Sequence, residues 1–512
     1  MTRLMIGAAL LLVTSYAGAD TLDTAIDGLR HPLWSARRDA AERIAELPET
    51  GSVAIPALIE SLSDVEVQVR RAAVRALAAV GRGSEAAVDA LVVALGDDDW
   101  VVRRQAALSL EGMRPTVVAA VPAIRSALSS ESAEVRTAAA LALSGLAPDS
   151  RQALPELVAA LNAPEWQLRA AAAHAIGALG TDAVEALPAL ANALRDRDWG
   201  VAEQVVESLS RIGKPAVPTL VTALGDPALP VRWGAARALG QIGPDAAEAA
   251  PALAGVLTDA TLQVRWAAAR SLWAIGPTAA VATPALVNAM SDKDWVVRWA
   301  SARALGAIVG DAYRDETVNA LATALADPDS RICEAAAFAL EQIGGAAASA
   351  VPALSVAATR TGTNADAETK ICQVIDVGPA AQEVLMETGW TVRWVSVRAL
   401  GVVGAGNPQA LPALTEALRD DEWQVRGVAT LAIGQYGDGV PAAAVDAVAQ
   451  MLRDDNAAVR KAAASALGDI GAPARVAITL LRDAENDQEP AVRASAGEAI
   501  ERILDRREEE LQ

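Results

Sequence analysis

The chain has few cysteines and histidines, and only one phenylalanine. Aromatic residues make up 3% of its 512 residues, so a core filled by large aromatic side chains is excluded. Two cysteines, Cys333 and Cys372, cannot form a disulfide framework. An oxidising compartment would permit one bridge, but we expect buried thiols because the two residues fall at different levels of neighbouring repeats.

Residue clusters typical of a metal site or a phosphate-binding site are also missing from the sequence. The two histidines, His31 and His174, belong to no His/Cys/Asp/Glu cluster with metal-ligand spacing. No glycine-rich phosphate loop occurs either. We therefore predict a protein that is not an enzyme, with no catalytic residues, no metal and no cofactor.

Positive charge is in deficit. The chain has 44 Lys and Arg against 64 Asp and Glu, which gives a formal net charge of −20. Binding to a phosphate backbone requires a basic surface, so nucleic acid is excluded as a partner, as is docking on anionic lipid. The acidic excess keeps an alanine-rich surface in solution.

The N-terminus has the pattern of an export signal. Arg3 provides a positive start, residues 4–13 are apolar, and Ala17-Gly18-Ala19 is a small-residue cleavage site. About ten apolar residues are too few to span a bilayer, so we predict a signal peptide over 1–19, cleaved after Ala19. No second stretch suggests a membrane span. The mature protein is expected in a periplasm or outside the cell.

The chain is rich in Ala, Leu and Val, which contribute most of its 52% hydrophobic residues, and these recur with a period. The most regular position is an Arg, here called slot zero. Ala202 and Cys333 occupy this position in two repeats. The first five of the recurring residues are 33 residues apart, and the full set is Arg37, Arg70, Arg103, Arg136, Arg169, Arg232, Arg265, Arg298, Arg393, Arg426, Arg460 and Arg493.

Helix start and stop signals surround slot zero. A proline often lies 14 residues earlier, where it fits the first turn of a helix. An N-cap residue lies four residues before slot zero and marks a second helix, which ends at a glycine such as Gly243 or Gly276. Each repeat is therefore predicted to be a pair of helices. The N-cap residues are Asp99, Ser132, Asp198, Thr261, Asp294, Asp329 and Asn456.

Residues 251–276 show the pattern in full, with Pro-Ala-Leu, Leu-x-Asp, Val-Arg-x-x-Ala and a final Ile-Gly. This pattern resembles the HEAT-repeat family, and its short period resembles the phycobilisome-lyase-like branch. The resemblance implies an all-α fold, a right-handed α-α superhelix of about fourteen or fifteen helix pairs over 20–497. An irregular repeat at about 359–389 is expected to be a hinge or an insertion, and residues 498–512 a charged C-terminal capping helix.

The tryptophans occupy particular slots. At 100° per residue, slots −1, +3, +6, +7 and +10 share the buried face of the second helix, whereas slots −3 and +1 point away from it. Eleven of the 12 Trp lie at −3 or +1; only Trp273 lies elsewhere. Slot +5 often carries Arg, four residues after a Trp, so we predict cation–π pairs. Slot-zero Arg residues are predicted to pair with the Asp residues at helix starts.

In HEAT solenoids the second helix lines the concave side, so the resemblance implies that these indoles face a groove. We predict partner binding there, because Trp and Arg are favoured binding anchors. The alternative is that neighbouring indoles stack and only stiffen the superhelix. The candidate residues are Trp233, Arg237, Trp266, Arg270, Trp295, Trp299, Arg303, Trp390, Trp394 and Arg398.

The sequence thus predicts a non-catalytic, exported scaffold that binds a protein or peptide, with an acidic or extended segment fitting the groove. The alternative is an enzyme or lyase component of the HEAT-like family, bilin lyase-like or an oxidoreductase, acting on a bound small molecule. HEAT-like deoxyhypusine hydroxylases carry His-Glu pairs that this chain lacks. A closed pocket converging on His174 would favour the alternative, and a long open channel a polymeric partner.

Overall fold

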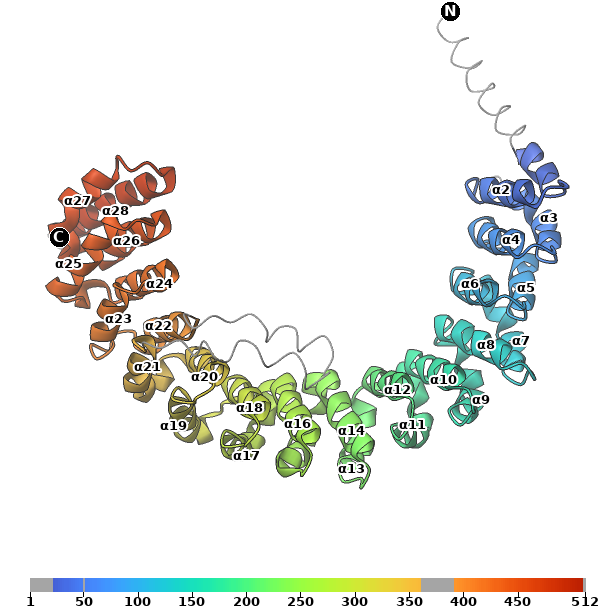
Figure 1. Ribbon diagram of the computed structural model, residues 1–512, viewed down its shortest axis with the longest axis horizontal. Helices are drawn as coiled ribbons and strands as arrows, with labels where there is room; N and C mark the ends of the chain where they lie inside the picture. Colours follow the sequence, from blue (N-terminus) through green and yellow to red (C-terminus); the bar gives the residue numbers. More distant parts are fainter. Residues whose placement is uncertain (1–21, 49–50, 361–390, 510–512) are drawn as a thin grey trace, which may run out of the picture. The chain divides into compact units, whose positions relative to one another are not determined.

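The computed structural model describes residues 22–48, 51–360 and 391–509, with side chains as far as residue 504. Within these ranges the chain forms α-helices joined by turns and short 3-10 segments, with no strand, so the all-α prediction is confirmed (Figure 1). The chain divides into two compact units, an N-terminal unit that ends at Ala246 and a C-terminal unit that starts at Ala247.

The N-terminal unit alternates first and second helices. Its first helices are α3 (Ile55–Ser61), α5 (Glu85–Ala94), α7 (Val121–Ala127), α9 (Leu154–Ala160), α11 (Leu187–Ala193) and α13 (Val217–Ala223). Its second helices are α2 (Trp34–Ala45), α4 (Val67–Val80), α6 (Trp100–Glu111), α8 (Ala133–Gly145), α10 (Trp166–Ala178), α12 (Trp199–Ile212) and α14 (Leu229–Ile242). Its 3-10 segments are η1 (Gly51–Ala54), η2 (Thr116–Ala120), η3 (Asp149–Ala153), η4 (Gly180–Ala186) and η5 (Lys214–Ala216), and η6 (Gly243–Ala249) holds the division.

The C-terminal unit repeats the scheme. Its first helices are α15 (Ala250–Gly255), α17 (Thr283–Ala289), α19 (Arg314–Ala324), α21 (Val351–Ala358), α23 (Leu411–Ala417), α25 (Ala442–Gln450) and α27 (Ile478–Ala484). Its second helices are α16 (Leu262–Ile275), α18 (Trp295–Ile308), α20 (Ser330–Ile343), α22 (Thr391–Val403), α24 (Trp423–Gly434), α26 (Ala457–Ile470) and α28 (Pro490–Glu509). Its 3-10 segments are η7 (Val256–Thr258), η8 (Gly276–Ala282), η9 (Asp311–Tyr313), η10 (Gly344–Ala350), η14 (Gly437–Gly439), η15 (Met451–Arg453) and η16 (Ala472–Ala477).

The predicted helix signals are found at most helix ends. Pro lies in the first turn of first helices such as α3, α7 and α9. The side chains of five predicted N-caps accept a backbone N–H: Asp99, Ser132, Asp198, Asp329 and Asn456. Thr261 and Asp294 also stand at the N-cap positions of their helices, as predicted, but their side chains accept no backbone N–H; the Asp294 carboxylate binds Arg265 instead.

Within each unit the helices form two layers, because each second helix packs on its own first helix and on the second helix of the next repeat. The core between them is made of Ala, Leu, Val and Ile. In α14, Val231, Ala235, Ala238 and Leu239 are buried as predicted, and Ile242 is half-buried. This stacking of repeats buries an apolar face that one helix pair could not bury alone.

The irregular stretch falls between two partner helices. First helix α21 packs directly on second helix α22, as in the other repeats, and α22 packs on α20. The two helices therefore complete one repeat, although more than thirty residues separate them in sequence. Cys372, Trp390 and most of the predicted irregular repeat at 359–389 lie outside the described residues, as does the predicted signal peptide 1–19.

The predicted charged cap, 498–512, begins inside α28, which runs unbroken from Pro490 to Glu509. Cys333 is a buried thiol, and burial raises its pKa to about 11. Residues 262–289 are long and apolar enough to cross a membrane by length and composition, contrary to our expectation. However, Gly276 (φ +73°) ends α16, and the stretch consists of α16, η8 and α17 from two successive repeats.

Candidate functional site

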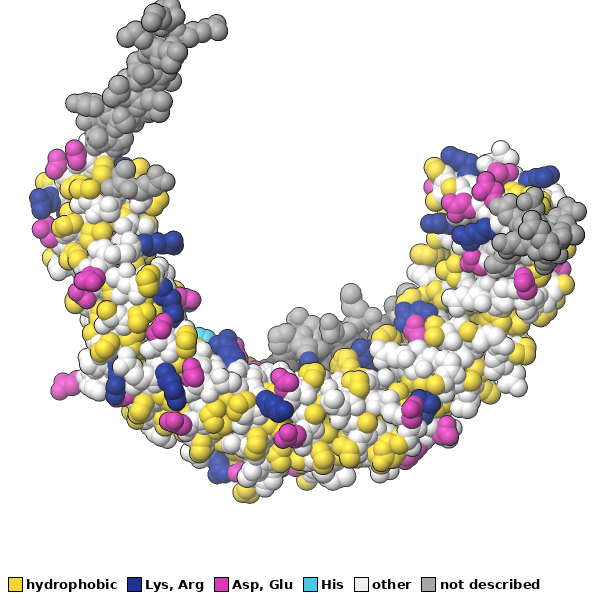
Figure 2. Space-filling model, turned by 180° about the vertical axis from the view of Figure 1, so that it is seen from behind, with side chains coloured by type: hydrophobic (Ala, Val, Ile, Leu, Met, Phe, Trp, Pro, Cys, Tyr) yellow, Lys and Arg dark blue, Asp and Glu magenta, His cyan; other side chains and the backbone are white. Residues whose placement is uncertain are grey.

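The solvent-facing side of the second helices, which carries slots −3, +1 and +5, is called the second-helix face below. Hydrophobic side chains are spread along the surface of both units, with Lys and Arg projecting between them (Figure 2). The indoles at slot −3 are the more open ones; Trp100 is 60% exposed and Trp199 66% exposed. The indoles at slot +1 are half-buried: Trp233, Trp266, Trp299 and Trp394.

The predicted cation–π pairs at slots +1 and +5 are present. The guanidinium of Arg237 lies 4.7 Å from the ring centroid of Trp233, in the N-terminal unit. In the C-terminal unit, Arg270 lies 5.4 Å from Trp266 and Arg398 4.6 Å from Trp394. These arginines also have partners within the chain, because Arg237 pairs with Glu203, and Arg398 with Glu341 at 2.7 Å.

In the C-terminal unit these contacts extend into a ladder across α16, α18, α20 and α22. The Arg303 guanidinium lies 4.8 Å from Trp273, 6.0 Å from Trp299 and 4.5 Å from Phe338. Arg398 also approaches Phe338, at 5.8 Å, and the Trp273 and Trp299 rings meet edge to face with centroids 6.1 Å apart. We call Trp273, Trp299, Arg303, Phe338, Trp394 and Arg398 the aromatic ladder.

The sequence prediction placed Trp273 apart from the other indoles, and the structure corrects this. Trp273 is at slot +8, which at 100° per residue points midway between slots −3 and +1. Helical rotation alone would therefore have placed Trp273 on the same face as the other indoles. Trp295 differs from the other slot −3 indoles, because Arg331 of the next repeat lies 3.3 Å above its ring and pairs with Asp329.

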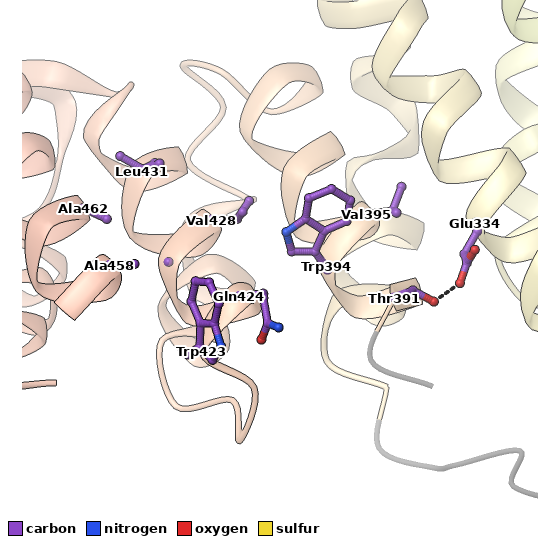
Figure 3. Close-up of a pocket in the computed structure, with 11 residues that line it drawn as sticks. Glu334, Thr391, Trp394, Val395, Trp423, Gln424, Val428, Leu431, Ala458 and Ala462 are labelled. Atoms are coloured by element: carbon purple, nitrogen blue, oxygen red, sulfur yellow. Dashed lines mark hydrogen bonds between the residues drawn. The ribbon is translucent and has the colours of Figure 1, made fainter. Parts of the chain in front are cut away.

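An open apolar groove of about 570 Å³ begins at the last rung of the ladder. It crosses α20, α22, α24 and α26 on the second-helix face, and the side chains of Trp394 and Trp423 both stand over it (Figure 3). Of the predicted site residues that the structure describes, only Trp394 lines it. The lining residues are Glu334, Thr391, Trp394, Val395, Trp423, Gln424, Gly427, Val428, Leu431, Ala458 and Ala462.

The groove offers apolar walls with hydrogen-bond acceptors. Leu431 is 44% exposed and Trp423 42% exposed, so both leave apolar area to be covered by a partner. Oε1 of Gln424 is buried and has no hydrogen-bond partner among the described residues. The Glu334 carboxylate accepts a hydrogen bond from the Thr391 hydroxyl.

Sequence reasoning did not single out Trp423 and Leu431 as groove residues. The available signals were Trp423 at slot −3 and Leu431 at slot +5, where five other repeats carry Arg.

His174 lies on α10 of the N-terminal unit and is not one of the groove's lining residues. Burial, with help from the nearby Arg211, lowers its pKa, and its buried Nδ1 has no hydrogen-bond partner among the residues that the structure describes. Across residues 22–48, 51–360 and 391–504, no group of three or more His, Cys, Asp or Glu side chains is arranged to hold a metal ion.

The slot-zero arginines join consecutive repeats, but their partner differs from the predicted one. Most pair with the Asp at slot −6 of the next repeat, in the turn before the N-cap, whereas Arg136 pairs with the N-cap Glu165 and Arg265 reaches the N-cap Asp294 as well as Asp292. Nε of Arg169 lies 2.5 Å from Asp196 Oδ2, and its Nη1 donates to the carbonyls of Ala163 and Pro164. The matching pairs are Arg37–Asp64, Arg70–Asp97, Arg265–Asp292, Arg298–Asp327, Arg393–Asp420, Arg426–Asp454 and Arg460–Asp487.

Comparisons with known proteins agree with this geometry. The sequence profile for HEAT repeats matches ten overlapping segments that together cover residues 22–366 and 379–501. No curated protein sequence matches the chain.

Solved structures similar to the chain include Kap121p bound to RanGTP, with 14% identity, a TM-score of 0.62, and coverage of 94% of this chain and 56% of that one. Kap121p bound to Pho4p gives 13% identity and a TM-score of 0.63, covering 94% and 57%. Kap95p bound to RanGDP gives 15% identity and a TM-score of 0.50, covering 96% and 73%. The chain thus spans a little over half of the Kap121p structures, and at these identities the likeness is one of fold.

Proposed function

Since the chain belongs to the HEAT-repeat family, we propose that it is a non-catalytic scaffold that binds a protein or peptide on the second-helix face of its C-terminal unit. The observation that carries the proposal is the open apolar groove bounded by Trp394 and Trp423. Indoles that line an apolar groove are typical of the anchors that dominate protein interfaces. The similar solenoid Kap121p, which binds RanGTP and Pho4p, gives the proposal a structural precedent.

The groove supports the proposal better than the ladder does. In the ladder, Arg303 and Arg398 already contact aromatic rings of the chain, and Arg398 also pairs with Glu341. These contacts favour a stiffening role for the rungs Trp299 and Arg303. They also weaken the expectation of an acidic partner segment, because a carboxylate of the partner would compete with one already in place.

The test is affinity capture with the full-length mature chain. A Trp423→Ala/Leu431→Ser variant removes the two open walls of the groove, and we expect captured proteins to fall at least tenfold, since anchor residues typically contribute about 2 kcal/mol or more each. Trp199→Ala is the matched control, because Trp199 is an exposed slot −3 indole of the N-terminal unit. A captured set that is the same for wild type and the groove variant, with both folded, would refute the site.

We further propose that the chain is exported to a periplasm or secreted, on the strength of the residues around Ala17-Gly18-Ala19. Intact mass and N-terminal sequencing of the protein from its native host should show a mature chain that begins at Asp20. A chain that retains Met1 and fractionates with the cytosol would contradict export without affecting the groove.

A further inference from the structure

The groove is open where slot +1 of α24 carries no side chain. Slot +1 carries a Trp in α14, α16, α18 and α22, and its ring covers the second-helix face. In α24 the same slot is Gly427, and slot +5 carries Leu431 in place of Arg. The position next to Trp394 therefore lacks both the indole and its cationic partner, and Gly427 lines the groove there.

Backbone geometry does not require this glycine. Gly427 lies inside α24 and is not among the glycines with positive φ. A Cβ added to it would meet only Val459 Cγ2, at 3.9 Å, an ordinary van der Waals distance. By contrast, Gly434 in the same helix is required by packing, because a Cβ there would lie 2.8 Å from Ala466 Cα.

The glycine also carries an energetic cost. Gly in a helix interior is less favourable than Ala, because its backbone loses more conformational freedom on folding. Space for a side chain is present at Gly427, so neither packing nor the stability of α24 accounts for the residue. The open volume beside it is what the glycine provides.

Resting on the function proposed above, we propose that the Gly427 slot receives an aromatic side chain of the partner protein, which supplies the missing rung of the aromatic ladder. The neighbouring side chains fit such a group, because Trp394 and Trp423 offer ring faces and edges, and Val428 and Leu431 offer aliphatic walls. Aromatic pairs of this kind gain stability beyond that of their buried area.

The charges in the turns before α24 and α26 indicate which residues flank that aromatic group. Three acidic residues, Asp420, Asp421 and Glu422, precede Trp423. Asp420 is neutralised by Arg393, whereas Asp421 is exposed and has no ion pair among the described residues. Asp455, in the equivalent turn before α26, is likewise exposed. The partner segment is therefore an aromatic residue flanked by Lys or Arg, by charge complementarity.

The experiment uses the full mature chain and the peptide Ac-Lys-(5-fluoro-Trp)-Lys-NH2, titrated by fluorine NMR. Wild type should bind it saturably, and Gly427→Ala should bind within about twofold because the slot stays open. Gly427→Trp fills the slot from within and should weaken binding at least tenfold, a change of about 1.4 kcal/mol. The same peptide with Glu in place of Lys should bind several-fold more weakly.

Equal binding by wild type and Gly427→Trp would overturn the proposal, as would stronger binding of the Glu peptide. If Gly427→Trp does not fold, Leu431→Glu replaces it, because that side chain is exposed on the groove wall. Sedimentation of wild type and of Gly427→Trp tests whether a second copy of the chain fills the slot. A wild-type dimer that Gly427→Trp converts to a monomer would show that the slot is filled by a second copy, and would overturn the partner assignment.

The two proposals fail separately. If the fluorinated peptide does not bind but Trp423→Ala/Leu431→Ser still loses captured proteins, the aromatic anchor is wrong and protein binding stands. If the peptide binds in the Gly427 slot while captured proteins do not depend on the groove, the slot is a small-ligand site and the scaffold function is wrong.

Discussion

The ion pair of Arg169 and Asp196 shows how a single residue joins two repeats. Both side chains are about 8% exposed, and the guanidinium makes two bonds to the carboxylate as well as two to backbone carbonyls of its own turn. Removing one member of a buried pair leaves the other charge without compensation, which is far more costly than losing an exposed pair.

We predict that Asp196→Ala lowers the free energy of unfolding of the N-terminal unit by about 3 kcal/mol. Urea denaturation followed by circular dichroism measures this loss. Glu60→Ala is the control, because the Arg30–Glu60 pair is exposed on both sides and should contribute less than about 1 kcal/mol. A similar effect of the two substitutions would contradict a joining role for the slot-zero arginines.

The same pairs predict a dependence on pH. The hydrogen bond from Arg460 lowers the pKa of Asp487, as that from Arg37 lowers the pKa of Asp64. A carboxyl group whose folded pKa lies below its unfolded value, about 3.9, stabilises the fold fully above that value and loses the contribution as the pH falls toward the folded pKa. The advantage of wild type over Asp487→Asn in thermal melting should therefore shrink below about pH 4. An advantage of wild type that grows on acidification would contradict a lowered pKa of Asp487 in the folded chain.

At the scale of one helix, α24 contains two glycines with opposite roles. Gly434→Ala should destabilise by about 1–3 kcal/mol, because its Cβ would overlap Ala466. Gly427→Ala should stabilise by about 0.5–1 kcal/mol, because a Cβ fits there without contact strain. Thermal melts of the two variants test the pair; destabilisation by Gly427→Ala would show that this position is needed for packing.

The direct packing of α21 on α22 leads to a prediction about the segment between them. We predict a small effect when residues 359–389 are replaced by Leu-Arg-Asp-Asp-Glu, the five-residue turn that joins α23 to α24. The melting temperature of the C-terminal unit should stay within a few degrees of the wild-type value, because the length of a connection changes stability only slowly. Loss of helical signal from the shortened chain would show that the replaced residues belong to the core.

Helix pairs and their buried faces could be predicted from sequence because their signals are local. Pro, N-cap residues and terminal Gly mark helix ends within a few residues of each other, and slots −1 and +3 follow from 100° of rotation. Partners across repeats could not be predicted in the same way. Asp196 lies 27 residues after Arg169, and the choice between it and the N-cap Asp198 depends on how the helices are offset. The groove was not predicted because it arises from an absent side chain, at Gly427, whereas the sequence analysis searched for side chains that are present.

In both units of the molecule contacts are sequential, since each second helix packs on the neighbouring second helices of its own unit. Stability in such an array is a sum of repeat and junction contributions rather than one cooperative quantity. We predict that Asp196→Ala raises hydrogen exchange in α10 and α12 while α24 and α26 keep wild-type protection. Exchange followed by mass spectrometry tests this, and a uniform loss of protection along both units would contradict it.

The Arg–Asp junction has a direction. Most slot-zero guanidinium groups reach forward to a carboxylate about 27 to 29 residues later, and most of these carboxylates also accept an N–H from their own turn, as Asp196 does from Asp198. A module cut at this boundary therefore carries a free arginine at one end and, at the other end, the carboxylate that pairs with such an arginine. Duplication of one such module in the gene would yield a longer array whose new joint already fits, so the length of the protein can change in evolution without redesigning an interface.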